Sequence, residues 1–404
     1  MNSTTLENNP LTSTEACLPK NLLCFSHLRW DFVYQRPQHL LSRFSKVAAV
    51  YFLEEPVLID TDKSYLAVSK REDNLWVCIP HIPSGLEHHQ IISELTQLLD
   101  FFFLGRNPAD FTFWYYTPMA LEFSQHITAG LTVYDCMDEL AAFKFAPDAL
   151  KSMEQRLLQA ADVVFTGGNS LFKAKKHLHN NIFSFPSSID KNHFFSARQT
   201  PPEPKDQASI KGTKIGFYGV IDERFDLSLI EKIADSHQDW KVIVIGPVVK
   251  IDPAQLPQRS NIYYLGPKNY QELPLYLSGW DVAMVPFLIN ESTQFVSPTK
   301  TPEYLCAGRP VVSTPIQDII DPYGDTGLVS IAHTSEEFIE AISFWLTSAD
   351  KIDWLTKADL FLDTMSWDIT FSNMVSEMNQ AYITRHANHQ ELINLPYITL
   401  SRGA

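Results

Sequence analysis

The sequence predicts an α/β protein of two doubly wound domains that face each other across a central cleft. Short apolar runs typical of buried strands alternate with amphipathic helical stretches along most of the chain. The alternation stops in the polar, proline-rich segment 195–212 and then resumes. Alternating strands and helices favour a parallel sheet with helices on both faces, and the interruption indicates an interdomain linker.

The first predicted domain covers residues 21–194, after a tail at 1–20 that we expect to be disordered. Its strand-like runs are LLCFS, VAAVYFLEE, LWVCIP, FTFWYY, LTVYDCM and DVVFTGG. Helical spacing appears in HLLSRFSK, SELTQLLDFFF and ALKSMEQRLLQAA between these runs. This order of elements is that of a doubly wound unit.

The second predicted domain covers residues 213–365. KIGFYGV, KVIVIGP, NIYYLGP, WDVAMVPF and PVVSTP read as its strands, and several end in Gly or Pro, where ligand loops begin. Ligands of such sheets bind beyond the carboxyl ends of the strands. In the last segment, 366–404, we expect an amphipathic helix from Trp367 to about His386 that packs back across the cleft.

The composition excludes several classes of protein. With 45% hydrophobic and 20% charged residues the chain is globular, and its net charge of −15 would repel a nucleic-acid backbone. Five scattered cysteines without a C-x-x-C pair indicate reduced thiols rather than disulfides or zinc. No apolar leader or membrane-spanning run is evident. We therefore expect a cytoplasmic protein with at most peripheral contact at the inner face of the membrane.

The strongest chemical signal is SPTKTPEYLCAGRPVVSTP, which begins at Ser297. Thr299 can cap the following helix, whose first-turn amides and dipole, together with Lys300, would hold a diphosphate. Glu303 lies on nearly the same helix face and can accept two hydrogen bonds from a ribose diol. The alternative is an ordinary capped helix with a surface ion pair between Lys300 and Glu303.

This segment resembles the donor-binding signature of GT-B glycosyltransferases of the large retaining family, family four. FPSSIDKNHF, KIGFYGVIDERFDL, NIYYLGPKNYQELPLYLSGWDVAMVPF and GDTGLV resemble further blocks of that family in the same order. The resemblance implies the GT-B fold and a nucleoside-diphosphate sugar donor. The donor-binding residues that it implies are Gly219, Arg224, Pro267, Tyr270, Ser297, Thr299, Lys300 and Glu303.

The N-terminal stretch FSHLRWDFVYQRPQHLLSR is similar to enzymes of the teichuronic-acid and surface-polysaccharide subgroup. The resemblance implies transfer of a sugar, with retention, from a UDP- or GDP-sugar to a hydroxyl of a surface polysaccharide, glycolipid or other lipid-linked acceptor. Such a reaction needs no divalent metal, and the chain contains no D-x-D motif. We therefore expect the nucleotide sugar as co-substrate and no cofactor.

Two departures from the family pattern leave alternatives open. The family's first Glu, eight positions before the ribose Glu, is replaced by Phe295, and Glu291 or Gln294 could substitute for it. Arg224 is the one basic candidate after the first strand of the donor domain, where the family tends to carry an Arg and a Lys. The alternatives are a GT-B sugar-nucleotide epimerase and a degenerate, non-catalytic partner of another transferase that still binds nucleotide sugar.

The N-terminal domain offers polar side chains at two expected strand ends. Arg36 and His39 could share one helical face toward the cleft, and Asp138 follows another strand as a possible general base. We predict these three as catalytic. Acceptor-side residues are predicted at His27, Arg29, Asp135 and Glu139. The alternative is a solvated helix start with one buried histidine, beside carboxylates that only cap loops and helices.

Overall fold

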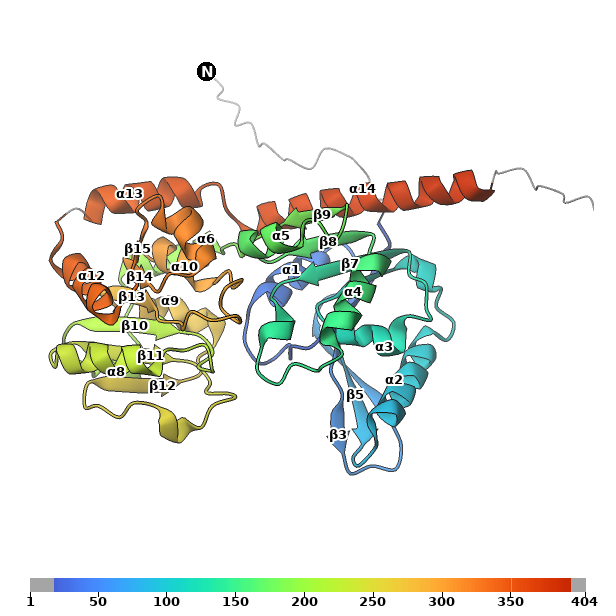
Figure 1. The fold of residues 1–404 in the computed structure, drawn as a ribbon, viewed down its shortest axis with the longest axis horizontal. Coiled ribbons are helices and arrows are strands. Elements are labelled where there is room, and N and C mark those ends of the chain that lie inside the picture. Colours follow the sequence, from blue (N-terminus) through green and yellow to red (C-terminus); the bar gives the residue numbers. More distant parts are fainter. Residues whose placement is uncertain (1–17, 350, 394–404) are drawn as a thin grey trace, which may run out of the picture.

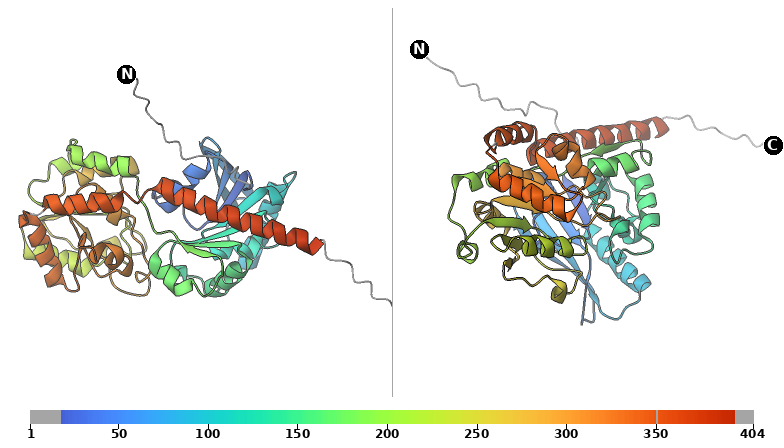
Figure 2. Two further views of the ribbon diagram at one scale, coloured as in Figure 1. Left: turned by 90° about the horizontal axis from the view of Figure 1, so that it is seen from above. Right: turned by 60° about the vertical axis from the view of Figure 1, so that its left-hand side comes forward.

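The structure, a computed structural model, describes residues 18–349 and 351–393 and contains two α/β domains side by side (Figure 1). Residues 1–17 of the expected tail at 1–20 lie outside the described residues, as does segment 394–404. Helix α14 (Trp367–Ile393) begins near the junction and runs along the first domain (Figures 1 and 2).

The first domain is built on a nine-stranded sheet in the order β3-β5-β2-β1-β6-β7-β8-β9, with β4 paired to β5. The strands are β1 (Asn21–Ser26), β2 (Ala49–Glu54), β3 (Val57–Ile59), β4 (Tyr65–Glu72), β5 (Leu75–Pro83), β6 (Phe111–Tyr115), β7 (Leu131–Cys136), β8 (Val163–Thr166) and β9 (Ile182–Ser184). The helices are α1 (Arg36–Phe44), α2 (His88–Phe103), α3 (Leu121–Ser124), α4 (Leu150–Ala160) and α5 (Asn169–Lys175).

The second domain is built on a six-stranded parallel sheet in the order β12-β11-β10-β13-β14-β15. Its strands are β10 (Lys214–Tyr218), β11 (Lys241–Ile245), β12 (Ile262–Gly266), β13 (Val282–Val285), β14 (Val311–Ser313) and β15 (Val329–Ile331). Its helices are α8 (Leu227–Ser236), α9 (Leu273–Leu277), α10 (Lys300–Cys306), α11 (Gln317–Ile319), α12 (Ser335–Thr347) and α13 (Lys351–Leu362).

One strand departs from the expected parallel pattern. β4 pairs antiparallel with β5, whereas the other strand pairs of the sheet are parallel. The sequence pattern did not predict β4 because its side chains are mostly exposed and carry no alternation of apolar and polar residues. Lys70 and Glu72 lie in this edge strand, where charges discourage pairing with another chain.

The segment expected as a linker is partly helical. It contains α7 (Lys205–Ala208), and α6 (Lys191–Phe195) directly precedes it. Ala197 and Ile210 are buried in the core of the second domain, so this segment packs against that domain. The core of the first domain lies in two clusters, and α14 adds Trp367 and Met374 to one of them.

Both sheets contain a switch point, where the strand order runs outward in two directions. In the first domain β1 lies between β2 and β6, and in the second β10 lies between β11 and β13. The carboxyl ends of such strands border a crevice suited to a ligand. In the second domain the loops that leave this crevice begin at Gly219, after β10, and at Pro286, after β13.

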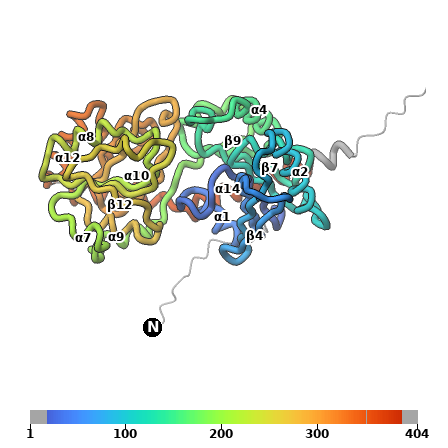
Figure 3. The backbone as a smooth tube through the Cα atoms, turned by 90° about the horizontal axis from the view of Figure 1, so that it is seen from below, coloured from blue at the N-terminus to red at the C-terminus, as the bar shows by residue number. Residues whose placement is uncertain are grey.

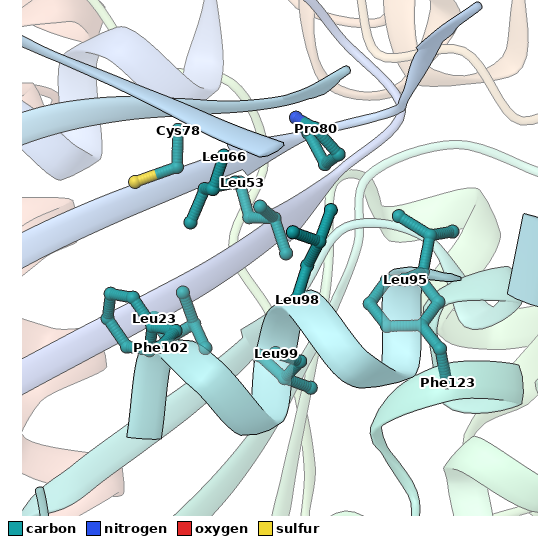
Figure 4. Close-up of a pocket in the computed structure, with 10 residues that line it drawn as sticks. All are labelled: Leu23, Leu53, Leu66, Cys78, Pro80, Leu95, Leu98, Leu99, Phe102 and Phe123. Carbon is teal, nitrogen blue, oxygen red and sulfur yellow. The ribbon is translucent and has the colours of Figure 1, made fainter. Parts of the chain in front are cut away.

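A small apolar pocket inside the first domain is not a candidate site (Figure 4). It lies between α2 and the sheet, and its lining of Leu, Phe, Pro and Cys side chains includes Leu23, Leu99, Phe102 and Phe123. Its volume of about 10 Å³ is room for roughly one water molecule. Because no charged group lines it, we interpret it as a packing gap.

Candidate functional site between the two domains

A cavity lies between the domains at the carboxyl ends of β7, β8, β10 and β13. We call it the central cavity. Its lining includes nine of the site residues predicted from the sequence: Arg36, Asp138, Gly219, Arg224, Tyr270, Ser297, Thr299, Lys300 and Glu303. A second, adjoining cavity reaches Pro267 and shares Tyr34, Tyr218, Gly219 and Tyr270 with the first. The two cavities have volumes of about 150 and 350 Å³.

Lys300 supplies an unpaired positive charge to the central cavity. Within the described part of the chain, no hydrogen bond or ion pair holds its ammonium, which instead lies 5.1 Å from the ring centre of Phe287 and 5.6 Å from that of Phe217. Burial lowers the pKa of Lys300 to about 8, with a further lowering by Arg224. The surface ion pair with Glu303, the alternative considered from the sequence, is not present.

Glu303 is buried rather than exposed. Its carboxylate accepts a hydrogen bond from the Tyr218 hydroxyl, and 4% of the residue is exposed. Burial raises the pKa of Glu303 to about 8, although the bond from Tyr218 and the charge of Lys300 act in the opposite direction. The sequence did not identify Tyr218, because a tyrosine at the end of an apolar strand reads as a core residue.

Arg224 lines the central cavity but is held by a neighbour. Its guanidinium donates to both carboxylate oxygens of the buried Asp222, at 2.6–3.1 Å. Its guanidinium carbon Cζ also lies over the rings of Phe143 and Phe287, at 5.3 and 5.9 Å from their centres. Asp222 therefore restrains Arg224 on one side, and part of its charge is already compensated.

Asp138 is the unpaired carboxylate of the site. Among the residues that the structure describes, none forms a hydrogen bond or ion pair with its side chain. Burial raises the pKa of Asp138 to about 6, while the charges of Arg224, Arg36 and Lys300 oppose that rise. Asp138 thus faces the same cavity as three cationic side chains.

Gly219 permits the backbone to approach Lys300. Its φ of +145° is a conformation that residues with a side chain rarely adopt. A Cβ atom there would lie 3.0 Å from Lys300 Cε and 3.2 Å from Phe217 Cζ. The glycine-ended strand noted in the sequence therefore serves both backbone geometry and close packing.

Thr299 does not cap α10 as expected. It occupies the N-cap position but already has helical dihedral angles, and its side chain makes no capping hydrogen bond. The preceding loop is instead tied to the first domain, because Ser187 Oγ donates to the Ser297 carbonyl over 3.0 Å. Ser297 and Thr299 nevertheless line the central cavity.

Tyr270 reaches the cavities with its ring edge rather than its face. Tyr34 stacks on one side of the ring at 4.4 Å, and His193 stacks at 4.5 Å. Because both partners lie nearly parallel to it, a ligand cannot stack on Tyr270 in this arrangement. Tyr34 belongs to the loop that precedes α1, and the backbone near α1 lies at the domain junction in Figure 3.

Arg36 and Asp135 form a buried ion pair inside the first domain. The Arg36 guanidinium donates to both oxygens of Asp135, at 2.8–3.2 Å, and to the Phe185 carbonyl at 2.7 Å. Asp135 is fully buried and does not line the central cavity. The prediction of an acceptor-side Asp135 is therefore corrected to a partner that fixes Arg36.

His39 does not enter the cleft as predicted. Its ring stacks on Trp367 of α14 at 4.6 Å with an angle of 12°, and only 2% of the residue is exposed. Burial, followed by the nearby charges of Arg43 and His193, holds the pKa of His39 well below its usual value. The alternative of a buried histidine at the helix start describes it better, because the ring packs in the hydrophobic core.

The other three residues predicted on the acceptor side, His27, Arg29 and Glu139, do not line either cavity. Arg29 pairs with Glu54 at 2.9 Å, and Glu139 pairs with Lys175 at 2.8 Å, so local ion pairs hold both. His27 follows β1; burial lowers its pKa to about 4, and its Nδ1 has no partner in the described structure.

Phe295 packs against the core of the first domain, across the cleft from its own domain. It therefore anchors the loop before α10 to the first domain. Glu291 and Gln294, the expected substitutes for the missing carboxylate, are exposed and line neither cavity. Asp138 is an unpaired carboxylate that does line the central cavity.

Three comparisons with known proteins bear on these observations. Residues 213–348 match a family described as "Glycosyl transferases group 1". A Bacillus subtilis protein named as a teichuronic acid biosynthesis glycosyltransferase is 27% identical over 217 residues, which cover 50% of this chain and 54% of that protein. The match thus spans about half the length of that curated relative.

Solved structures share the fold over nearly the whole chain. Sucrose-phosphate synthase from Thermosynechococcus elongatus superposes with a TM-score of 0.65 at 12% identity, covering 91% of this chain and 100% of that one. An Escherichia coli structure described as trehalose-6-phosphate bound with UDP-2-fluoro glucose gives a TM-score of 0.66 at 11% identity, covering 89% and 99%. The chain therefore has the GT-B fold, as predicted, and its residues 213–348 are similar to a glycosyltransferase family.

Helices of the described chain are all too short or too polar to cross a membrane.

Proposed function

We propose that this chain transfers a sugar from a nucleoside-diphosphate sugar, with UDP or GDP as the nucleotide, to a hydroxyl of a surface polysaccharide, glycolipid or related acceptor, with retention of configuration. The observation that carries the proposal is the interdomain cavity that both the unpaired Lys300 ammonium and the Glu303 carboxyl line. The polysaccharide acceptor rests on the teichuronic acid relative, and peripheral contact with a membrane would bring a lipid-linked acceptor to the cleft.

The donor would occupy both cavities. Lys300 and the close backbone at Gly219 would hold the diphosphate, because a buried ammonium attracts an anion strongly where water is excluded. Glu303 would accept hydrogen bonds from the ribose. The base would enter the adjoining cavity beside Pro267, a fit supported by its larger volume.

With retention, a group of the donor rather than of the protein would accept the proton of the acceptor hydroxyl. In that mechanism the acceptor hydroxyl attacks the face that the diphosphate leaves, and the departing phosphate oxygen takes the hydroxyl proton. The protein then acts by positioning the reactants and compensating the charge that develops on the diphosphate. Asp138 would orient an acceptor or sugar hydroxyl, and no divalent metal is needed.

A binding and transfer assay tests the function. Calorimetry with UDP, GDP and their sugars should identify one nucleotide that binds, since a ligand selective for the folded state also raises the melting temperature. NMR of the product formed with an oligosaccharide or lipid-linked acceptor should show the anomeric configuration of the donor. Binding without turnover would favour the degenerate partner, and conversion of the donor sugar without acceptor would favour the epimerase.

Replacing Asp138 with Asn tests its role in that mechanism. If Asp138 only orients a hydroxyl, Asp138→Asn should keep donor affinity and lose about tenfold or less in kcat, because a neutral oxygen still accepts a hydrogen bond. A general base would be lost entirely, with a decrease of about 100-fold or more. A large loss together with an inverted product would therefore contradict retention.

Glu303→Gln should show its effect only at alkaline pH. With a pKa of about 8, the Glu303 carboxyl is mostly protonated at pH 7, and the amide replaces it with little change. At pH 9 the ionised carboxylate would bind the ribose diol through stronger, charge-assisted hydrogen bonds. Calorimetry with the nucleoside should give affinities within about threefold at pH 7 and about tenfold weaker for the variant at pH 9. Equal affinities at pH 9 would place the ribose elsewhere.

A further inference from the structure

Phe143 of the first domain faces two cations of the second. It follows the short turn Leu140–Ala142 after β7, and its ring lies under the Arg224 guanidinium at 5.3 Å. The Lys250 ammonium lies 5.2 Å from the centre of the same ring. These contacts cross the cleft, because Arg224 and Lys250 both belong to loops of the second domain.

The contacts continue as an alternating row of cations and aromatic rings. Arg224 also lies over Phe287, which in turn faces Lys300 at 5.1 Å. Lys300 is also near Phe217, at 5.6 Å. Of the three rings in this row, Phe143 is the one supplied by the first domain. The row therefore leads from the first domain to the expected diphosphate position.

Aromatic rings suit this position because they attract cations without neutralising them. Arg224 and Lys300 line the central cavity and the exposed Lys250 lies at its outer side; these like charges repel one another, and the carboxylates nearby compensate only part of that repulsion. Asp222 binds Arg224, and Glu223 lies 3.6 Å from Lys250. The negative face of a ring holds a cation in place and leaves its N–H groups available to an incoming anion.

We propose that Phe143 is a positioning residue that completes the phosphate site from the acceptor side by orienting Arg224 toward the donor diphosphate when the domains are together, while Lys250 packs against the same ring outside the central cavity. The inference rests on the proposed donor site. It makes diphosphate binding depend on the first domain, although the diphosphate would lie against the second. Phe143 itself touches no reacting atom and acts through Arg224.

Phe143→Leu and Phe143→Tyr test this role, with Phe145→Leu as the matched control. Leucine keeps an apolar side chain but removes the ring face, whereas tyrosine restores the face. Phe145 lies two positions away in the same loop, is 78% exposed and faces only Lys144 of its own domain among the cations described. Calorimetry with the nucleoside, the nucleoside diphosphate and inorganic pyrophosphate measures binding, and donor KM and kcat are measured with saturating acceptor.

We expect Phe143→Leu to weaken the binding of nucleoside diphosphate and of pyrophosphate about threefold to tenfold and to leave the affinity for the nucleoside unchanged. The donor KM should rise more than kcat falls, and Phe143→Tyr and Phe145→Leu should behave as the parent protein. Unchanged diphosphate affinity in Phe143→Leu, or an equal loss for the nucleoside, would overturn the inference while the donor site stands. If the parent protein binds neither nucleoside diphosphate nor pyrophosphate, the proposed function and this inference are both wrong.

Discussion

Lys300→Ala should abolish most of the affinity for nucleoside diphosphate and leave affinity for the nucleoside nearly unchanged. The ammonium is the unpaired cation of the central cavity, so its removal leaves a diphosphate without the charge that the site offers. Hydrogen bonds to charged groups contribute about 1.5–3 kcal/mol, or roughly tenfold to 100-fold in affinity. Because charge on the diphosphate grows as the sugar departs, the loss in kcat/KM should reach about 100-fold or more.

The pH dependence of the parent protein gives this prediction an internal check. Since the pKa of Lys300 in the free protein is about 8, its ammonium is charged at pH 7 and mostly neutral at pH 9. The advantage of nucleoside diphosphate over nucleoside should therefore shrink between pH 7 and pH 9 in the parent and stay small throughout in Lys300→Ala. The control is Lys232→Ala. Lys232 is an exposed lysine on α8 whose ammonium donates a hydrogen bond to Ser335 of α12. Equal losses for nucleoside and diphosphate would mean that Lys300 has only a structural role.

The part of the site that lies within one short segment could be predicted from the sequence. Lys300 and Glu303 stand three residues apart at the start of one helix, so local geometry alone brings both to the same cavity. The fold class was predictable for a similar reason, because strand and helix periodicities are local. The protonation of Glu303 could not be predicted. It depends on burial of its carboxyl next to Tyr218, which lies on a different element of the same domain.

Residues whose neighbours come from distant segments were predicted less well. Arg36 and Asp135 are 99 positions apart, and no spacing rule indicates that one neutralises the other. His39 is covered by Trp367, which arrives with the last helix of the described chain. A polar residue at a strand end or helix start suggests a site, but only tertiary packing decides whether the side chain reaches the cleft or is enclosed.

Phe295 shows how a departure from a family pattern can have a structural explanation. The sequence suggested that a neighbouring carboxylate or amide would replace the missing Glu. The structure instead uses the ring to fasten the loop before α10 to the first domain, next to the bond between Ser187 and Ser297. The loop is thus fastened to the first domain at two points, which leaves recognition of the sugar to other groups.

Gly219→Ala should weaken binding of nucleoside diphosphate about tenfold or more and cost about 1–3 kcal/mol of stability. The added Cβ would lie 3.0 Å from Lys300 Cε and 3.3 Å from its Nζ, so the end of the lysine must shift by a few tenths of an ångström and its contact with the diphosphate is disturbed. The φ of +145° also strains any residue with a side chain, at a cost of about 1–3 kcal/mol. We expect affinity for nucleoside diphosphate to fall about tenfold or more, by analogy with the loss of one charged hydrogen bond.

Gly327→Ala separates the two effects of that substitution. Gly327 lies in the same domain with a φ of +72°, but no atom lies within 4 Å of the position that a Cβ would take. This control should lower the melting temperature by a few degrees through backbone strain alone, roughly 2–4 °C per kcal/mol, and keep parent-like nucleotide affinity. Gly219→Ala should lose affinity at a similar melting temperature, as measured by calorimetry and thermal unfolding of both variants. If Gly219→Ala binds nucleoside diphosphate as the parent does, the diphosphate does not lie against this turn and the proposed arrangement of the donor is wrong.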